Sequence, residues 1–250
     1  MTVPRVTPYR QRDSMGAGTG NNGGDQLLAL LQVANASFPT GAFSHSYGFE
    51  TWIAEGIVSD AASAEGRCRD WLRFGIATAD AVAVVAAFRD TLYNDMGGIV
   101  ALDRRVDALK LARETRSAST KTGAALIAAC RDIFAIEQAG RLDGMVRSGT
   151  TPGHHAVVYG VVGASLGFTE HQTVASFLWT GFSNLVSVVA RLVPLGQVEV
   201  QRIVAAGAPL VEECTEIART RPVERMGSLL ASLDTAAMRH ERLPSRLCIS

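Results

Sequence analysis

The hydrophobic and polar residues of this chain follow one another with the three- and four-residue spacing of amphipathic helices. The clearest example places four apolar residues on one face of an expected helix: Ile99, Leu102, Val106 and Leu109. The same spacing recurs in five further segments: 27–31, 68–76, 126–134, 200–204 and 210–218. Ser59 and Thr78 are expected to cap two of the helices. Alternating runs of strand length are nearly absent, so the pattern predicts an all-α protein.

The stretch from Gln172 to Ala190 carries no charge and predicts a long central helix for a single-domain helical bundle. Thr169 and Gln172 have the spacing of a capping box at its start, and Pro194 would end it. Because its apolar side chains point in every direction, we expect this helix to be buried on all sides. Its many hydroxyl and amide side chains argue against a membrane span.

Small side chains at four-residue spacing in this helix would let a second helix approach closely. A core helix is the simpler interpretation, and the alternative is that part of it also forms a homodimer interface. The residues expected at that interface share one face of the helix: Trp179, Ser183, Ser187 and Arg191.

The two ends of the chain differ from the rest in composition. The first 24 residues contain five glycines interleaved with Ser, Thr and Asn, and they cannot bury enough surface to offset the entropy of ordering. The last residues are rich in arginine and include Pro244, so alone they are expected to be mobile. We therefore predict a disordered extension at 1–24, a helical domain at 25–237 and a tail at 238–250.

A short segment offers an enzymatic alternative. Gly163, Ser165 and Gly167 match the Gly-x-Ser-x-Gly pattern of a nucleophile elbow, and Asp234 and His240 follow in the chain order of α/β hydrolases. The elbow needs a strand before the serine, whereas the small residues around the motif recur every four positions, as in a closely packed helix. A helix is the favoured interpretation, and a serine hydrolase remains the alternative function.

Charge and composition narrow the other function classes. The formal net charge is zero, so no overall attraction to nucleic acid or to an anionic membrane is expected. The four cysteines form no Cys-x-x-Cys pair and no signal peptide is recognised, which favours a reducing cytoplasm. No phosphate-binding loop is present, and the adjacent His154 and His155 would point apart on a helix. We expect no catalytic residue, no bound metal and no cofactor.

The most distinctive stretch runs from Phe38 to Glu50. Pro39, Gly41 and Gly48 predict a turn-rich loop, and its aromatic side chains lie among hydroxyl groups. From the residues alone, a loop pinned by its aromatic side chains and a binding surface are equally good interpretations.

This stretch resembles the signature of urease accessory proteins of the UreF type, which this chain matches from Leu30 to Glu50. The resemblance continues in three further segments: Leu111–Arg116, Ser183–Gln197 and Met238–Leu247. It covers about residues 25–250. Two departures lie in the tail, namely Pro244 where the family commonly has an aromatic residue, and Cys248 with Ile249 where it more often ends in an aromatic residue and arginine.

The resemblance implies a homodimeric, all-helical adaptor and chaperone without catalytic activity of its own. Proteins of this type join a UreD-type partner, also called UreH-type, and a UreG-type GTPase. Their assembly acts on urease apoprotein to insert its nickel centre. The UreF-type member has been viewed as regulating GTP hydrolysis by its partner, and nickel as passing transiently through the complex.

Two surfaces of this sequence follow from the resemblance. The GTPase-facing or nickel-passing surface is expected to comprise Phe43, Ser44, His45, Ser46, Tyr47 and Glu50. The surface for the UreD/UreH-type partner is expected in the tail, at Arg239, His240, Glu241, Arg242, Ser245 and Arg246. Since Tyr47 and Glu50 are expected on the surface, alanine at both positions should leave folding nearly unchanged.

Overall fold

The structure is a computed structural model that describes residues 22–249, without the side chains of Asn22 and Phe43. Every regular element in this range is a helix, which confirms the predicted all-α class. The α-helices are α1 Asn22–Val33, α2 Phe49–Ala54, α3 Ala61–Asp70, α4 Asp80–Leu92, α5 Met96–Leu109, α6 Arg113–Phe134, α7 Glu137–Arg147, α8 His155–Ser165, α9 Glu170–Leu192, α10 Gln197–Thr220 and α11 Ala231–His240. Shorter helical turns are η1 Ala42–Ser44, η2 Trp71–Ile76 and η3 Val223–Arg225.

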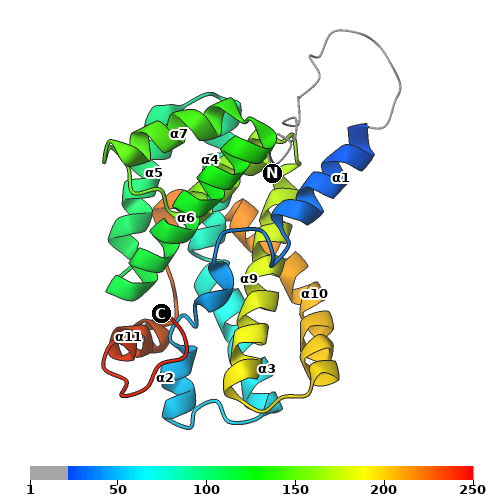
Figure 1. Cartoon of the computed structure of the whole chain (residues 1–250), viewed down its shortest axis with the longest axis vertical. Coiled ribbons are helices and arrows are strands. Elements are labelled where there is room, and N and C mark those ends of the chain that lie inside the picture. The colour runs from blue at the N-terminus through cyan, green and yellow to red at the C-terminus, as the bar shows by residue number, and fades with distance from the viewer. Residues whose placement is uncertain (1–21, 250) are drawn as a thin grey trace, which may run out of the picture.

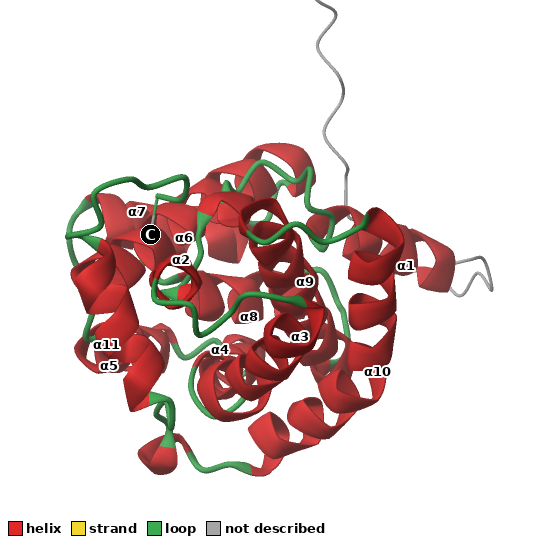
Figure 2. Ribbon diagram, turned by 90° about the horizontal axis from the view of Figure 1, so that it is seen from below, coloured by secondary structure: helices red, strands yellow, loops and turns green. Residues whose placement is uncertain are grey.

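Helix α8 lies at the centre of the bundle (Figure 2). Its residues 156–164 are all buried, and it packs against α4, α6 and α9. Helices α9 and α10 form an antiparallel pair along one side, and α5, α6 and α7 lie on the other (Figure 1). Helices α2 and α11 pack together and close one end of the bundle, where the C-terminal tail also lies.

The close packing of α8 on α4 depends on a glycine. Gly160 faces the backbone of α4, and a Cβ placed on it would lie only 2.4 Å from the carbonyl oxygen of Val84. The helix expected from the four-residue spacing of small residues is therefore confirmed. A bare backbone at this position is what lets the two helices touch.

The α/β-hydrolase alternative is contradicted by this fold. Ser165 lies in the last turn of α8, and its hydroxyl donates to the carbonyl oxygen of Val161 at 2.7 Å. His240, the general base of that alternative, lies instead between the carboxylates of Glu50 and Glu114. A nucleophile elbow also needs a strand before the serine, and residues 22–249 contain none.

Helix α9 begins and ends where the sequence indicates. Thr169 and Gln172 form the predicted capping box, each side chain accepting from the backbone N–H of the other. The helix is not buried on every side, however, because neighbouring helices leave one stripe uncovered. Trp179, Ser187 and Arg191 are exposed along this stripe. Although α9 is long and apolar enough to cross a membrane, its apolar side chains pack into the bundle as in a core helix.

Two expected helix caps are corrected. Asp60 rather than Ser59 caps α3, because its carboxylate accepts from the backbone N–H of Ser63 at 2.8 Å. The Thr78 hydroxyl does not cap α4, since it donates backwards to the carbonyl oxygen of Phe74. In both places the sequence located the helix start to within two residues.

The segments 200–204 and 210–218 belong to one continuous helix, α10, which passes through Pro209. Proline removes one backbone donor from a helix interior. Here α10 packs along the length of α9 and buries an apolar face over 24 residues, which outweighs that loss.

The predicted N-terminal extension lies mostly outside the described residues, which begin at residue 22. Residues 22–24, assigned to that extension from composition, form the first turn of α1. The helical region therefore begins slightly earlier than the composition indicates.

Candidate functional site

The motif segment, residues 38–50, is folded tightly against α11. Gly41 and Gly48 both have positive φ angles, and so does Tyr47 with φ of 53°. A Cβ on Gly48 would lie 2.8 Å from the backbone nitrogen of Ala237 in α11, so only glycine allows this approach. The segment ends in the short helix α2, which places Glu50 against the tail.

The carboxylate of Glu50 is a buried anchor for the C-terminal tail. Its oxygens accept from Nε2 of His240 at 2.9 Å and from the backbone N–H groups of Leu247 at 2.6 Å and Cys248 at 3.0 Å. Glu50 is 7% exposed and His240 is fully buried. Three charge-assisted or backbone hydrogen bonds therefore converge on one carboxylate.

A second carboxylate completes this arrangement. Nδ1 of His240 lies 2.6 Å from Oε2 of Glu114, and Arg246 donates to Oε1 of the same carboxylate at 2.9 Å. An imidazolium donates from both ring nitrogens, and this form satisfies both carboxylates. We call Glu50, Glu114, His240 and Arg246 the tail-anchoring cluster. It joins residues from both surfaces that the sequence predicted separately.

The electrostatics of Glu50 favour its charged form. Burial by itself pushes the pKa of this carboxyl upward, but the N–H groups of Leu247 and Cys248 and the His240 imidazole together hold the pKa below its ordinary value. The carboxylate is therefore stabilised by the tail, and the tail is held by the carboxylate.

The motif segment is less exposed than the sequence indicated. His45, Ser46 and Glu50 are buried, whereas Ser44 and Tyr47 are half-buried. The side chain of Phe43 lies outside the described atoms. The expectation that Glu50 can be replaced without effect on folding is therefore revised, because its removal would leave buried partners unpaired. A role of these residues toward the GTPase stays a prediction.

The tail residues predicted to bind a partner occupy different environments. Arg239 pairs with Glu55, and Glu241 pairs with Arg113. The side chains of Arg242, Ser245 and Arg246 are exposed, whereas that of His240 lies in the core. The UreD/UreH-type contact stays a prediction for all of them.

The tail also exposes apolar side chains that the sequence analysis did not single out. Leu247 is 79% exposed and Ile249 is 61% exposed. The backbone of both residues is nevertheless fixed, since Leu247 N–H donates to Glu50 and Ile249 N–H donates to the carbonyl of Ser44. Two large apolar groups are thus held outward on an ordered segment.

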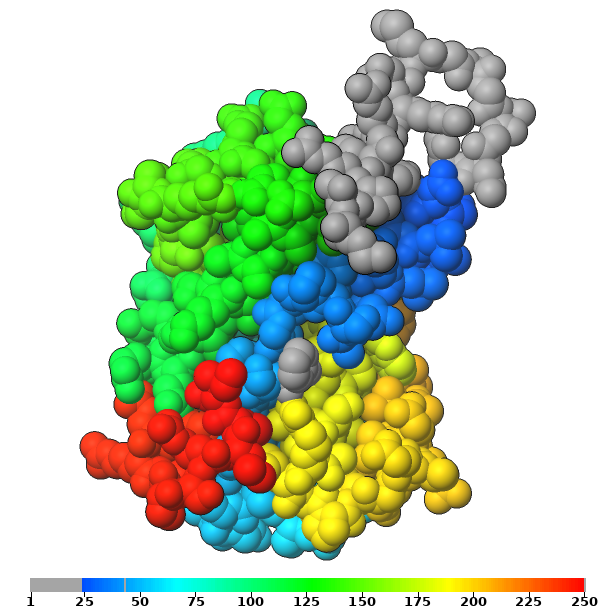
Figure 3. Space-filling model, viewed as in Figure 1, coloured from blue at the N-terminus to red at the C-terminus, as the bar shows by residue number. Residues whose placement is uncertain are grey.

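The tail and the exposed stripe of α9 lie on the same face of the molecule (Figure 3). Arg191, at the end of the stripe, is close enough to Cys248 to affect the electrostatics of its thiol. The predicted interface residues Trp179, Ser183 and Ser187 continue this stripe along α9, with Ser183 half-buried and the other two exposed. The fold therefore places the predicted homodimer interface on α9 beside the predicted partner-binding tail.

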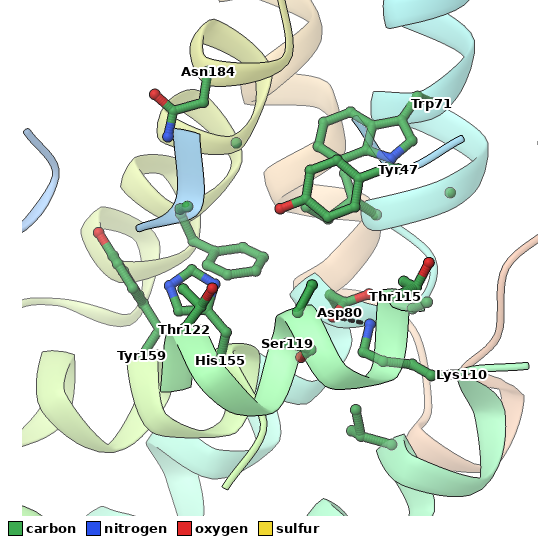
Figure 4. Close-up of a pocket in the computed structure, with 18 of the residues that line it drawn as sticks. Tyr47, Trp71, Asp80, Lys110, Thr115, Ser119, Thr122, His155, Tyr159 and Asn184 are labelled. Carbon is green, nitrogen blue, oxygen red and sulfur yellow. Dashed lines mark hydrogen bonds and ion pairs between the residues drawn. The ribbon is translucent and has the colours of Figure 1, made fainter. Parts of the chain in front are cut away.

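A central cavity of about 150 Å³ lies between the motif segment and helices α6, α8 and α9 (Figure 4). The aromatic rings of Tyr47 and Trp71, 5.5 Å apart, form part of its wall. Polar side chains point into it from several elements: Asp80, Lys110, Thr122, His155, Tyr159 and Asn184. A cavity with this many polar groups has room and partners for several water molecules.

Charges in the cavity are paired or suppressed. Lys110 donates to Asp80 at 2.7 Å. Burial by itself would raise the pKa of Asp80, but the ammonium group of Lys110 more than offsets this, so the pKa is lowered and the carboxyl stays ionised. Burial lowers the pKa of His155 to about 4, which keeps its imidazole neutral. The cavity therefore contains the neutral imidazole of His155 and the ion pair between Lys110 and Asp80.

The two adjacent histidines point apart, as the sequence predicted. The ring nitrogens of His154 lie 3.0 Å from the hydroxyl of Ser119 and 3.1 Å from the carboxylate of Asp107, whereas His155 faces the cavity. They do not form a shared metal site.

Sequence reasoning missed Glu114 and the cavity. Glu114 belongs to the segment Leu111–Arg116 that carried part of the family resemblance, which is the signal that could have identified it. The cavity residues come from the motif segment, η2, α4, the loop before α6, and helices α6, α8 and α9, so no spacing rule could have joined them.

Comparisons with known proteins agree with one another. The family model described as UreF matches residues 58–208. The urease accessory protein UreF of Geobacillus kaustophilus is 34% identical over 225 residues, covering 90% of this chain and 98% of that protein. The urease accessory protein UreF of Cereibacter sphaeroides (strain ATCC 17029) is 36% identical over 222 residues, covering 88% and 97%. With a family model that spans more than half of its length and relatives matched over nearly their whole length, this chain belongs to the UreF family of urease accessory proteins.

Proposed function

We propose that this protein is a non-catalytic adaptor and chaperone of urease maturation in the cytoplasm. It joins a UreD/UreH-type protein to a UreG-type GTPase, regulates GTP hydrolysis by that partner, and so supports nickel insertion into urease apoprotein. The observation that carries the proposal is the match to urease accessory proteins over about nine-tenths of the chain. The ordered tail with its outward apolar groups supports it.

The tail is the proposed docking site for the UreD/UreH-type partner. Leu247 and Ile249 offer apolar area. The exposed side chain of Arg242, and the N–H groups of Arg246 that do not bind Glu114, offer donors for carboxylates and carbonyls at its rim. Because the tail-anchoring cluster fixes the backbone in advance, less ordering entropy is lost on binding.

Replacing Leu247 and Ile249 together by aspartate should weaken binding of the UreD/UreH-type partner by at least about tenfold, since apolar anchors dominate such interfaces. Both side chains point outward, so the thermal melt should stay nearly unchanged. Co-purification of tagged protein with the two accessory partners and urease apoprotein provides the measurement. Val198→Asp, at a residue 66% exposed on α10, is the matched control and should bind normally. Unchanged capture of the partner by the double variant would place the docking site elsewhere.

The exposed stripe of α9 is the proposed homodimer interface. Ser187→Arg should convert a dimer to a monomer, because an unpaired charge buried at a twofold interface costs about 3–5 kcal/mol. Ser187 is exposed in the single chain, so the fold itself should tolerate the change. Light scattering coupled to size exclusion measures the mass, with Gln201→Arg on the exposed face of α10 as the control. A dimeric Ser187→Arg protein, or a monomeric parent, would contradict this interface.

Nickel is proposed as transient cargo of the assembly and not as a resident cofactor of this chain. In the part of the chain that the structure describes, the central cavity is one place where a passing cation would meet polar side chains. The neutral imidazole of His155 and the carboxylate of Asp80 are its candidate contacts, with Lys110 as the competing cation.

A further inference from the structure

The open end of the α9–α10 pair brings together three possible metal ligands that are separate in the sequence. His171 lies in the first turn of α9, and Glu212 and Glu216 lie one turn apart on α10. Nε2 of His171 is 2.7 Å from Oε1 of Glu212. One ligand atom from each of the three residues lies within 4.8 Å of the other two.

We propose that His171, Glu212 and Glu216 form a surface site for a divalent transition cation such as Zn²⁺. One imidazole nitrogen and two carboxylate oxygens are a common ligand set for this ion, with solvent in the remaining position. Bonds of about 2.0–2.2 Å to one ion would set the three ligand atoms about 3.4 Å apart, which widens the 2.7 Å contact between His171 and Glu212 and keeps all three atoms within their present 4.8 Å. The three side chains are partly exposed, so they can make this small adjustment.

The backbone that carries these ligands is rigid. The capping box of Thr169 and Gln172 fixes the first turn of α9 on both sides of His171. On α10, Cys214 and Thr215 are fully buried between the two glutamates, which keeps both carboxylates on the outer face. The four-residue spacing of Glu212 and Glu216 places them on the same side of the helix. Only side-chain rotation is needed to close the site.

One positive charge competes for the site. Arg219 donates to Glu216 at 2.6 Å and to Glu170 at 2.9 Å, and Glu170 also pairs with Arg89 at 2.7 Å. A bound cation displaces Arg219 from Glu216 but leaves its pair with Glu170 intact. Arg219 therefore weakens binding of the cation without blocking it.

The test is calorimetric titration of Zn²⁺ into the chelator-treated full chain. The parent should bind Zn²⁺ at this site, and His171→Ala and Glu212→Gln should each weaken that binding by at least about tenfold. Arg219→Ala should strengthen it by about threefold or more, because a competing charge is removed. Glu213→Gln is the matched control, since Glu213 pairs with Arg73 instead and is not part of the ligand set. Circular dichroism confirms that each variant is folded.

Two further measurements distinguish this site from cation binding elsewhere on the chain. Co²⁺ bound to the parent should give a visible d–d absorption band that is lost in His171→Ala, because the imidazole is a ligand. Mg²⁺ should not compete with Zn²⁺ at similar concentration, because it prefers oxygen ligands. Zn²⁺ binding that is unchanged in His171→Ala, absent in the parent, or equally matched by Mg²⁺ would overturn the proposal. None of these outcomes depends on the role in urease maturation.

Discussion

Replacing Glu50 by alanine is expected to release the C-terminal tail and to lower the free energy of unfolding by about 3–5 kcal/mol. The change leaves one ring nitrogen of the buried His240 and the backbone N–H groups of Leu247 and Cys248 without their acceptor. His240 is fully buried, so its ring nitrogen cannot exchange this acceptor for water, and it keeps only the carboxylate of Glu114 as a partner. The N–H groups of Leu247 and Cys248 lose the contact that holds the tail in place. Chemical denaturation measures the stability, and hydrogen exchange of residues 241–249 measures tail release.

The matched control is Glu55→Ala, because Glu55 directly follows α2, the helix that carries Glu50. Glu55 forms a solvent-exposed pair with Arg239, so its loss should cost less than about 1 kcal/mol. Equal stability of the two variants would show that the tail-anchoring cluster does not hold the tail.

The contribution of Glu50 should also depend on pH. Its pKa in the folded protein is held below the ordinary value of 4.5, so the carboxylate stabilises the fold fully above that value. As the pH falls through the lowered pKa, the folded protein takes up this proton and the contribution is lost. The stability difference between the parent and Glu50→Ala should therefore shrink in acid. A difference that stays constant down to pH 3 would contradict this origin.

Gly160→Ala is expected to destabilise the fold by about 2–3 kcal/mol or more, because its new methyl group cannot be accommodated without moving a helix. The Cβ would lie 2.4 Å from the carbonyl oxygen of Val84 and 2.9 Å from the Cβ of Ala87, both on α4. Neither backbone nor a Cβ atom can rotate away, so α8 and α4 have to separate. Thermal and chemical denaturation followed by far-ultraviolet circular dichroism would measure the loss.

Gly140→Ala on α7 serves as the comparison, since a Cβ placed on Gly140 has no neighbouring atom within 4 Å. That substitution should stabilise the protein by about 0.4–1 kcal/mol, because alanine lowers the conformational entropy of the unfolded chain. Opposite signs for the two variants support a packing role for Gly160. A neutral Gly160→Ala would mean that α4 and α8 do not touch as described.

Local patterns in the sequence identified most of the helices because amphipathic spacing and capping residues act over one or two turns. The capping box at Thr169 and the small-residue spacing around Gly160 are examples that the structure confirms. The same rules misjudged how far α9 is buried, because exposure depends on which faces the other helices cover. Composition cannot supply that arrangement.

Most of the candidate site could not be predicted from local sequence patterns. Glu50 and His240 are 190 positions apart, and neither has a neighbour in sequence that indicates the other. The tail looked mobile because it is rich in arginine and contains a proline. One buried histidine between two carboxylates, with two backbone donors beside it, outweighs that composition.

The two departures from the family pattern in the tail find a physical explanation. Cys248 and Ile249 are held through their backbone N–H groups, which donate to Glu50 and to the carbonyl of Ser44. Backbone contacts of this kind do not depend on the side chain, so an aromatic residue and an arginine are not required for anchoring. Pro244 lies exposed in the turn after α11 and interrupts none of these hydrogen bonds.

The central claim, that this protein supports nickel insertion into urease, is tested most directly by the nickel content of urease itself. Urease would be purified from cells that carry its structural genes and the other accessory genes, with or without this chain. Nickel per active site and the rate of urea hydrolysis would then be measured. We predict nickel-filled, active urease with the parent chain, and nickel-poor, inactive urease without it or with the Leu247→Asp, Ile249→Asp variant. Equal nickel occupancy and activity with and without the chain would contradict the proposed function.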